Sequence, residues 1–462
     1  MESFSAVVTT GIYCRPGCSA RPSPENVRAY PLAAASEAAG FRACLRCRPY
    51  RVAQPLGQVG PELVCRAVQL IVDGALDDTT EPELASRLGV SARHLRRLFV
   101  TNVGVTPDQL ARSRRAHFAR RLLDDSDLAI TDIAFAAGFG SVRQMNRALQ
   151  EVFRASPSEL RRRRRAADRL VADGGLSVRL PYEGALDWPT MASYLSGRAV
   201  RGVEHVTDDG MTYRRTVLVD GDPGVIEVTP AGDDDDRSLM LVAHLPHWEG
   251  LIHLVQRVRR IFSLDVDMGA ANDALAHDPA IGPLVEKRPG LRVPGTWDPF
   301  EIGVRAIVGQ QISVAGATTI MGRLVERLGA PVPGLAQLRL DRLFPTPDAV
   351  ATGDLAALGL TTSREKALAS FAAAVAEGRV LLDRSVSTDE FVSSLVALAG
   401  IGEWTAQYVA MRMGEPDAFP ASDLGLRRGF DRTDPPSAGQ LATHAEAWRP
   451  WRSVAAVHLW HA

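Results

Sequence analysis

Four of the five cysteines lie in two close pairs near the start of the chain, Cys14 with Cys18 and Cys44 with Cys47. Two short pairs separated by 25 residues are typical of a tetrahedral zinc site. Two disulfides or buried thiols are the alternatives, and a reducing compartment favours the metal. Zinc keeps cysteine as the nucleophilic thiolate, so such a site could be structural or reactive. Cys65 lies in an apolar helical stretch and is expected in the core.

A second candidate for chemistry is Asp423, which follows Trp404 by nineteen residues. The segment 398–412 before it predicts two helices joined by a tight turn, in which Gly400 and Gly402 let backbone N–H groups approach a phosphate. A carboxylate near a sugar stabilises the positive charge that develops when a glycosidic bond breaks. Asp423 could instead cap a helix, and the two roles are compatible.

Length and charge limit the context in which these residues act. The 462 residues predict two to four domains, and 46% hydrophobic with 23% charged residues is an ordinary globular composition. Residues 1–175 carry a formal charge of +8 and the remainder −9. A basic half favours a nucleic-acid partner, although solvated surface is the alternative. No apolar run approaches the ~20 residues of a membrane span and no secretory signal is evident, so we expect a cytoplasmic protein.

The elements that must position these residues change along the chain. Residues 60–165 have apolar side chains at helical spacing, and 171–175 predicts a linker. Alternating stretches at 225–230 and 238–245 predict strands, and from about Gly250 the pattern is helical again. Segments 84–99 and 130–153 each predict a helix-turn-helix, with glycine at the turn and Ser91 or Ser141 as N-cap.

The segment that contains the four cysteines resembles the N-terminal domain of Ada proteins. The motifs that show this are TTGIYCRPGC (9–18), ENVRAY (25–30) and AGFRACLRCRP (39–49). The resemblance implies that Cys14 irreversibly accepts a methyl group from a DNA methylphosphotriester, and that Cys14, Cys18, Cys44 and Cys47 hold one zinc ion. Methylation would remove one negative charge from the site, so affinity for DNA phosphates should rise. Flanking arginines could contact phosphates or serve only solubility: Arg15, Arg42, Arg46 and Arg48.

Residues 60–165 resemble the AraC-type DNA-binding module, which also follows the zinc domain in Ada proteins. A single helix-turn-helix pattern is weak evidence, since helical hairpins are common, but two at this spacing in a basic segment favour DNA binding. The resemblance implies promoter DNA and RNA polymerase as partners. Residues on the predicted recognition helices could meet base edges or phosphates: Arg93, Arg96, Arg97, Arg143, Gln144 and Arg147.

From about residue 176 to the end the chain resembles AlkA-type alkylbase glycosylases of the helix-hairpin-helix superfamily. The words that carry this are LDWPTMASYLSGRAV (186–200), KRPGLRVPGTWDPFEIGVRAIVGQQIS (287–313), FPTPDAVA (344–351), LAGIGEWTAQYVAMR (398–412), AFPASDLGLRR (418–428) and WRPWRSVAAVHLW (448–460). The resemblance implies that Asp423 is the catalytic carboxylate acting on a flipped base. It also implies a DNA-contacting hairpin at Gly400, Gly402 and Thr405, with a possible monovalent cation there.

The resemblance further implies an aromatic base pocket formed by Tyr194, Trp404, Tyr408 and Trp460, although core packing alone would explain such residues. A π face attracts the positively charged 3-methyladenine and 7-methylguanine nucleosides. Glycosylases of this superfamily that also nick the strand carry lysine where Trp404 stands, so we expect a monofunctional enzyme. Gln311 replaces the wedging leucine frequent in AlkA proteins, and Leu424 replaces an aromatic residue after Asp423.

The sequence thus predicts a small α+β four-cysteine zinc domain (1–55), an all-α double helix-turn-helix domain (60–165), and an α+β glycosylase with an antiparallel sheet subdomain (176–265) and all-α helix-hairpin-helix subdomains (266–462). The expected function is release of 3-methyladenine, 7-methylguanine and related bases, with methyl transfer to Cys14 that activates DNA binding and transcription. The alternative is a methylation-sensing transcription factor with an inactive glycosylase domain. We expect a monomer that acts on double-stranded alkylated and promoter DNA at the bacterial nucleoid, with no membrane association.

Overall fold

The computed structural model describes residues 3–20, 22–52, 60–164, 175–219, 221–231 and 237–462. The chain forms two compact units, Met1–Tyr182 with Met240–Gln256, and Glu183–Leu239 with Arg257–Ala462. The predicted linker, except Gly175, and the acidic run Asp233–Asp236 lie outside the described residues. Within the described part, no helix has the length and apolarity needed to traverse a bilayer.

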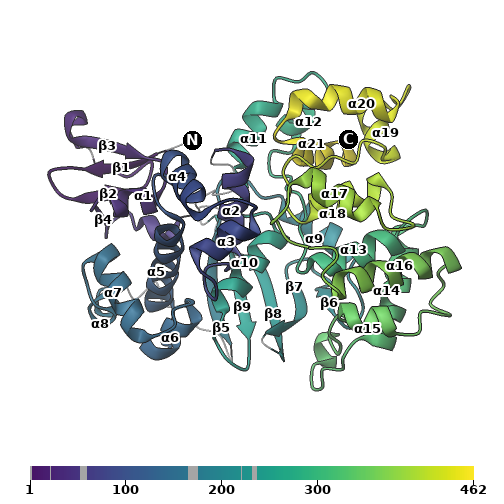
Figure 1. Cartoon of the computed structure of the whole chain (residues 1–462), viewed down its shortest axis with the longest axis horizontal. Coiled ribbons are helices and arrows are strands. Elements are labelled where there is room, and N and C mark those ends of the chain that lie inside the picture. Colours follow the sequence, from purple (N-terminus) through teal and green to yellow (C-terminus); the bar gives the residue numbers. More distant parts are fainter. Residues whose placement is uncertain (1–2, 21, 53–59, 165–174, 220, 232–236) are drawn as a thin grey trace. The chain divides into compact units, whose positions relative to one another are not determined.

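The first unit begins with a four-stranded sheet of order β3-β1-β2-β4 (Figure 1). Strands β1 (Phe4–Val7), β2 (Ile12–Cys14) and β3 (Val27–Tyr30) pair antiparallel, whereas β4 (Arg42–Ala43) pairs parallel with β2. Because Tyr13 pairs with Ala43, the residues that follow them, Cys14 and Cys44, lie at the same end of the sheet. Helix α1 (Ala33–Ala38) completes the small α+β fold that the sequence predicts.

Seven helices follow, and serine caps define two of them. The side chain of Ser91 accepts a hydrogen bond from the backbone N–H of His94, and that of Ser141 accepts one from Gln144. Gly89 and Gly138 have φ of 72° and 78° at the preceding turns, a conformation that favours glycine. Both predicted helix-turn-helix segments are therefore confirmed. The helices are α2 (Glu62–Val72), α3 (Glu81–Arg87), α4 (Ala92–Asn102), α5 (Pro107–Asp125), α6 (Ile130–Ala136), α7 (Val142–Phe153) and α8 (Pro157–Arg162).

Cys65 differs from expectation. It lies on α2 but is only half-buried, and its thiol donates to the carbonyl oxygen of Gly60 at 3.5 Å. The apolar face of α2 is formed instead by Val64, Val68 and Ile71, which are buried against α4 and α5. Helical periodicity alone did not distinguish the edge of this face from its centre.

A second sheet has the strand order β5-β9-β8-β7-β6, and the boundary between the two units runs through β9. Strands β7 and β8 pair antiparallel from Tyr213–Val228 to Val219–Asp222, and β6 pairs antiparallel with β7. Strands β8 and β9 confirm the strands predicted at 225–230 and 238–245. The bounds are β5 (Leu176–Pro181), β6 (Glu204–Val206), β7 (Tyr213–Val219), β8 (Asp222–Pro230) and β9 (Ser238–His244), with α9 (Trp188–Ser196) between β5 and β6 and α10 (Leu251–Ile261) after β9.

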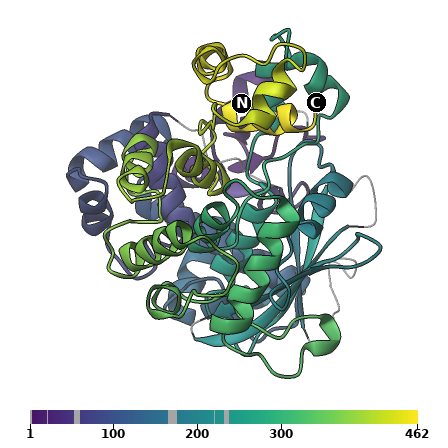
Figure 2. The ribbon, with the colours of Figure 1, turned by 90° about the vertical axis from the view of Figure 1, so that its right-hand side faces the viewer.

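The rest of the second unit is helical (Figure 2). Within it α13 contacts α14, α16 and α18, whereas α21 contacts α12 and α19. Phe300 stacks on Phe371 at 5.5 Å, and a Cβ at Gly303 would lie 2.3 Å from the Phe371 ring, so glycine permits this close packing. The helices are α11 (Met268–Leu275), α12 (Gly282–Lys287), α13 (Pro299–Val308), α14 (Val314–Leu328), α15 (Pro347–Thr352), α16 (Thr362–Ala376), α17 (Thr388–Val396), α18 (Glu403–Arg412), α19 (Leu424–Phe430), α20 (Ala438–His444) and α21 (Arg452–Trp460).

Candidate functional site

Asp423 lies at the start of α19, half-buried, with both carboxylate oxygens engaged. Its Oδ1 accepts from the backbone N–H of Leu426 at 3.0 Å and from the indole N–H of Trp460 at 3.0 Å. Its Oδ2 accepts from the indole N–H of Trp404 at 2.8 Å. Asp423 is therefore a helix N-cap, as the simpler interpretation held. The two tryptophans also fix its orientation, which a cap alone does not require.

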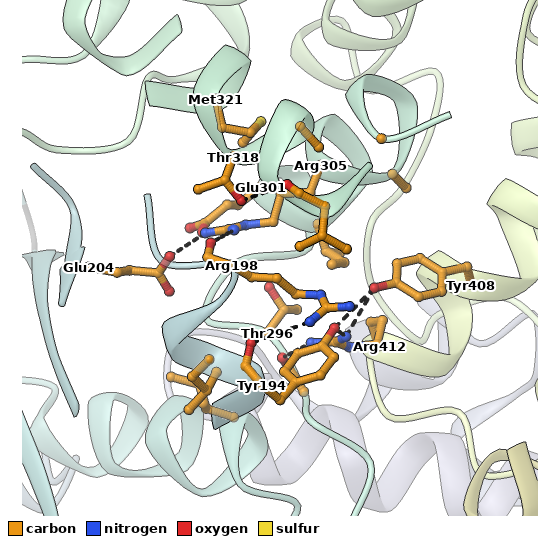
Figure 3. A pocket seen from close by; sticks show the side chains of 18 of the residues that line it. Tyr194, Arg198, Glu204, Thr296, Glu301, Arg305, Thr318, Met321, Tyr408 and Arg412 are labelled. Carbon is orange, nitrogen blue, oxygen red and sulfur yellow. Dashed lines mark hydrogen bonds and ion pairs between the residues drawn. The ribbon is translucent and has the colours of Figure 1, made fainter. Parts of the chain in front are cut away.

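The four predicted pocket aromatics meet around this carboxylate. Trp404 stacks on Tyr408 with centroids 5.4 Å apart, and Trp460 lies edge-on to Tyr408 at 6.3 Å. The hydroxyl groups of Tyr194 and Tyr408 are 3.1 Å apart. Together with Asp423 these residues line a cavity of about 860 Å³. Figure 3 shows Tyr194 and Tyr408 among the side chains that line it. The sequence thus identified residues that the fold brings to one cavity from α9, α18, α19 and α21.

Gln310, which the sequence analysis did not single out, contacts the hairpin between α17 and α18. The side-chain amide of Gln310 donates to the carbonyl of Gly400 and to the hydroxyl of Thr405, both at 3.1 Å. Thr405 is buried, and its expected contact with DNA stays a prediction. The neighbouring Gln311 is exposed, with φ of 57°.

The two hairpin glycines differ in what they tolerate. Gly400 has φ of 87°, and a Cβ there would lie 2.7 Å from the Cβ of Ala367, whereas nothing lies within 4 Å at Gly402. We expect Gly400→Ala to lower the free energy of unfolding by about 1–3 kcal/mol, because alanine is strained at positive φ and collides with α16. Gly402→Ala is the matched control and should change it by less than about 1 kcal/mol. Thermal denaturation measures both, and equal losses would contradict this account.

The four N-terminal cysteines form a second site. Their Sγ atoms all lie within 4.8 Å of one another, compared with the ~3.8 Å separation in a tetrahedral ZnS₄ centre with ~2.3 Å bonds. Burial and the charges of Cys44 and Cys47 raise the pKa of Cys14 far above its usual range, and burial chiefly raises that of Cys47 to about 12. Although burial acts to raise it, hydrogen bonds from the backbone N–H groups of Cys47 and Arg46 lower the pKa of Cys44. Because the pKa values of Cys14 and Cys47 are raised, a bound divalent cation is what would let all four cysteines act as thiolates. The donor set fits Zn²⁺.

We expect the purified protein to contain one tightly bound zinc ion per chain. Cys44→Ser should remove it and unfold the first 50 residues, since structural zinc supplies folding free energy directly. Cys65→Ser, outside the cluster, is the control and should retain the metal. Metal analysis together with thermal denaturation tests this, and a folded first domain without zinc would contradict it.

The zinc domain packs onto α5 through buried polar contacts, which we call the α5 junction. Tyr13, next to Cys14, donates its hydroxyl hydrogen bond to Glu37 at 2.5 Å, and His117 of α5 lies 2.6 Å from the same carboxylate. Further along α5, Tyr50 donates to Asp124 at 3.0 Å, and Arg51 pairs with Asp125 at 2.5 Å.

Arg48 belongs to this junction, which corrects its expected role as a phosphate contact. The residue is 8% exposed and its guanidinium lies 4.0 Å from the carboxylate of Asp124. Arg15 and Arg46 are exposed and Arg42 is half-buried, so a phosphate contact stays a prediction for these three residues. Arg48 differs from the other three arginines in its main chain. It adopts φ of 48°, which turns the chain after Cys47.

The predicted recognition residues of α4 and α7 are all exposed. Arg96 is nevertheless held by both carboxylate oxygens of Glu81 at 2.9 and 3.0 Å, and Arg147 pairs with Glu151 at 3.1 Å. A bidentate pair fixes a guanidinium, so Arg96 orients α4 on α3 in this state. Within the part of the chain that the structure describes, no carboxylate partner is found for Arg93, Arg97, Arg143 or Gln144, and these four residues stay predictions as DNA ligands.

Sequence reasoning missed Gly425 and Arg412. A Cβ at Gly425 would lie 2.9 Å from Asp423 Oδ1 and 3.1 Å from the Trp460 ring, so glycine keeps the indole against the carboxylate. The glycine two residues after Asp423 was the available signal. Arg412 follows Trp404 and Tyr408 at four-residue spacing on α18, which places it on the same helical face.

Fold and site together define a class of protein: a helix-hairpin-helix DNA glycosylase fold in one chain with a four-cysteine metal domain and a double helix-turn-helix module. Four family models match, namely the metal binding domain of Ada at residues 2–50, a helix-turn-helix domain at 84–163, the AlkA N-terminal domain at 177–298, and the HhH-GPD superfamily base excision DNA repair protein at 304–453. The order of the domains is the order that the sequence predicts.

Similar whole chains agree. A "probable bifunctional transcriptional activator/DNA repair enzyme AlkA" of Mycobacterium tuberculosis is 39% identical, covering 98% of this chain and 92% of that protein. The chain therefore belongs to the family of bifunctional transcriptional activator/DNA repair enzymes that join Ada and AlkA domains. DNA-3-methyladenine glycosylase 2 of Escherichia coli is 33% identical over 61% of this chain and 96% of that protein. The 3-methyladenine DNA-glycosylase structure from Archaeoglobus fulgidus has a TM-score of 0.53 at 21% identity, covering 61% and 97% of the two chains, and shows the shared fold.

Proposed function

We propose that this protein hydrolytically releases 3-methyladenine, 7-methylguanine and related alkylated bases from double-stranded DNA, without strand cleavage. The observation that carries the proposal is Asp423, whose two oxygens are fixed by the indole N–H groups of Trp404 and Trp460 inside an aromatic cavity. A flipped nucleotide would place its base among the aromatic rings and its sugar at the carboxylate. The carboxylate then stabilises the oxocarbenium character of the sugar, and water completes the hydrolysis.

The hairpin between α17 and α18 would bind a phosphate of the DNA and so hold the flipped nucleotide at the carboxylate. Gly402, the exposed N-cap of α18, presents backbone N–H groups at a helix N-terminus, which favours a phosphate. The exposed Gln311 is the proposed wedge for the vacated stack. A monovalent cation at the hairpin stays part of this proposal.

The second proposed reaction is methyl transfer to Cys14. The Cys14 thiolate attacks the methyl carbon of a methylphosphotriester, so that an S–C bond forms, the C–O bond breaks, and the phosphodiester leaves with a negative charge. Bound zinc would keep the four sulfurs as thiolates. Loss of one negative charge at the site then strengthens binding of the helix-turn-helix domain to promoter DNA and activates transcription.

The remaining features of the proposal rest on the same resemblance. We propose domain bounds of 1–55, 60–165, 176–265 and 266–462, a monomer in the cytoplasm at the nucleoid, and RNA polymerase as partner during activation. The competing function is a methylation-sensing transcription factor whose glycosylase domain binds DNA without catalysis.

One experiment separates the two functions. The full-length protein is incubated with methylated duplex DNA, and released bases are identified by chromatography. The proposal predicts multiple turnovers of 3-methyladenine with intact strands until the abasic sites are cleaved by alkali. Binding to DNA without base release would establish the competing function.

A further inference from the structure

One contact of the α5 junction reaches the residue next to the proposed methyl acceptor. Tyr13 directly precedes Cys14 on β2, and it is 0% exposed. Strand β2 lies between β1 and β4 in the sheet, so its main chain is held on both sides. Whatever holds the side chain of Tyr13 therefore also holds the strand that ends in Cys14.

The side chain of Tyr13 is held by two residues from different elements. Glu37 of α1 accepts the hydroxyl hydrogen bond of Tyr13 with Oε1 at 2.5 Å. Nε2 of His117 on α5 lies 2.6 Å from the same Oε1 and 3.3 Å from the Tyr13 hydroxyl. Because α5 is a helix of the helix-turn-helix domain, these three side chains join that domain to the zinc domain. We call them the Tyr13 cluster.

Other contacts fix the zinc domain against several helices of the same compact unit. Leu32 and Ala35 at α1 belong to one hydrophobic core with residues of α2, α4 and α5. Strand β4 packs against α7, and the guanidinium of Arg154 at the end of α7 donates to the carbonyl of Gly40 at 3.5 Å. The zinc domain therefore packs on both predicted recognition helices, α4 and α7.

The Tyr13 cluster is better suited to fixing geometry than to adding stability. Oε2 of Glu37 is buried and has no hydrogen-bond partner among the described residues. Burying a carboxylate costs free energy that its contacts recover only in part, and apolar side chains could join the two surfaces as firmly. Hydrogen bonds add direction, because each requires a set distance and angle.

A fixed geometry matters for the proposed effect of methylation. Methylation removes one negative charge at the metal site, and salt screens such a charge beyond about 8 Å at physiological ionic strength. The lost charge can therefore strengthen DNA binding only if the site is kept within that range of a phosphate. A zinc domain that moved freely on the helix-turn-helix domain would lose most of this effect.

We propose that Glu37 and His117 are positioning residues, which hold Cys14 through Tyr13 at a fixed place relative to α5, so that methylation of Cys14 changes DNA binding by the helix-turn-helix domain. The inference rests on the methyl transfer and the DNA binding proposed above. It adds the side chains that couple the two.

The test compares Tyr13→Phe with the unaltered full-length protein, because this change removes the hydroxyl and keeps the ring that packs against Phe4. The probe is a duplex selected from random sequences by the methylated, unaltered protein. Its Kd is measured at one salt concentration before methylation and after mass spectrometry shows one methyl group on Cys14. We expect the ratio of the two Kd values to be several-fold in the unaltered protein and at least about twofold smaller in Tyr13→Phe.

Zinc content and the Kd of the unmethylated protein should be the same for Tyr13→Phe and the unaltered protein. Tyr30→Phe removes a hydroxyl from β3 of the same domain and is the matched control, which should keep the full ratio. His117→Leu should lower the ratio as Tyr13→Phe does. His117→Gln, which keeps a donor N–H near the place of Nε2, should restore part of it. If His117→Leu does not retain zinc, Tyr13→Phe alone decides.

The outcomes separate this inference from the proposed function. A merely structural role would weaken both Kd values by the same factor and leave their ratio unchanged. That result, or a full ratio in Tyr13→Phe, would overturn the inference while the proposed function stands. If the unaltered protein gains no methyl group on Cys14, or gains one without tighter binding, the proposed function fails and the inference fails with it.

Discussion

Asp423→Asn is expected to lower the release of 3-methyladenine by about 10²-fold or more, equivalent to about 2.7 kcal/mol of transition-state stabilisation. The amide keeps one oxygen to cap α19 but has no charge to oppose the positive sugar. With that oxygen in the place of Oδ1, which also accepts from Trp460, the NH₂ group would meet the indole N–H of Trp404, so this one donor loses its acceptor. The free energy of unfolding should therefore fall by only about 1 kcal/mol.

The matched control is Asp267→Asn. Asp267 also caps a helix, accepting from the backbone N–H of Ala270 at 3.0 Å, but it does not line the cavity. It should lose a similar fraction of stability and keep full activity. Single-turnover rates and thermal denaturation measure both effects. Normal base release by folded Asp423→Asn protein would reduce Asp423 to a structural cap.

Cys14→Ser is expected to abolish methyl transfer altogether, because a serine hydroxyl is not ionised at neutral pH and is a far weaker nucleophile than a thiolate. The unaltered protein, incubated with methylated DNA, should gain one methyl group on the peptide containing Cys14. Its affinity for promoter DNA at fixed salt should then rise several-fold, since removing one charge near a phosphate contributes on the order of 1 kcal/mol. Mass spectrometry and binding isotherms measure the two steps.

Cys65→Ser, which leaves the cluster intact, should behave as the unaltered protein does. A methyl group found on Cys18, Cys44 or Cys47 would refute the assignment of Cys14. An unchanged affinity after methylation of Cys14 would refute the electrostatic switch and leave only the transfer.

Local chemistry explains what could be predicted from the sequence. Serine caps at Ser91 and Ser141, turn glycines and alternating strands are short-range signals, so the helix-turn-helix pair and strands β8 and β9 were found at their places. The two cysteine pairs and Asp423 belong to sequence motifs that are specific enough to identify a family. The meeting of Asp423 with Tyr194 and Trp460 was implied by resemblance and is seen in the cavity.

What could not be predicted depends on contacts between distant segments. The sequence shows Arg48 and Arg96 as exposed cations in basic stretches, but not that Asp124 and Glu81 face them. The same limit hid Arg412, because a cation at helical spacing from two aromatic residues looks like a solvated position. Its contacts with the hydroxyl groups of Tyr194 and Tyr408 and with the carbonyl of Gly295 are visible only in the folded chain.

The α5 junction has a consequence for how this protein can be taken apart. Asp124 and Asp125 of α5 are 0% and 3% exposed. Asp124 pairs with Arg120 of the same helix, but Tyr50 and Arg51, which also bind this pair of carboxylates, lie before the segment 53–59. A fragment that begins after residue 59, at the boundary between the two predicted domains, would lack Tyr50 and Arg51. Its Asp124 and Asp125 side chains would therefore lose these partners. The zinc segment is therefore not an independent module. A fusion of this segment with another helix-turn-helix protein should include α5. Without α5, the buried polar groups of the zinc segment would face a surface that does not complement them.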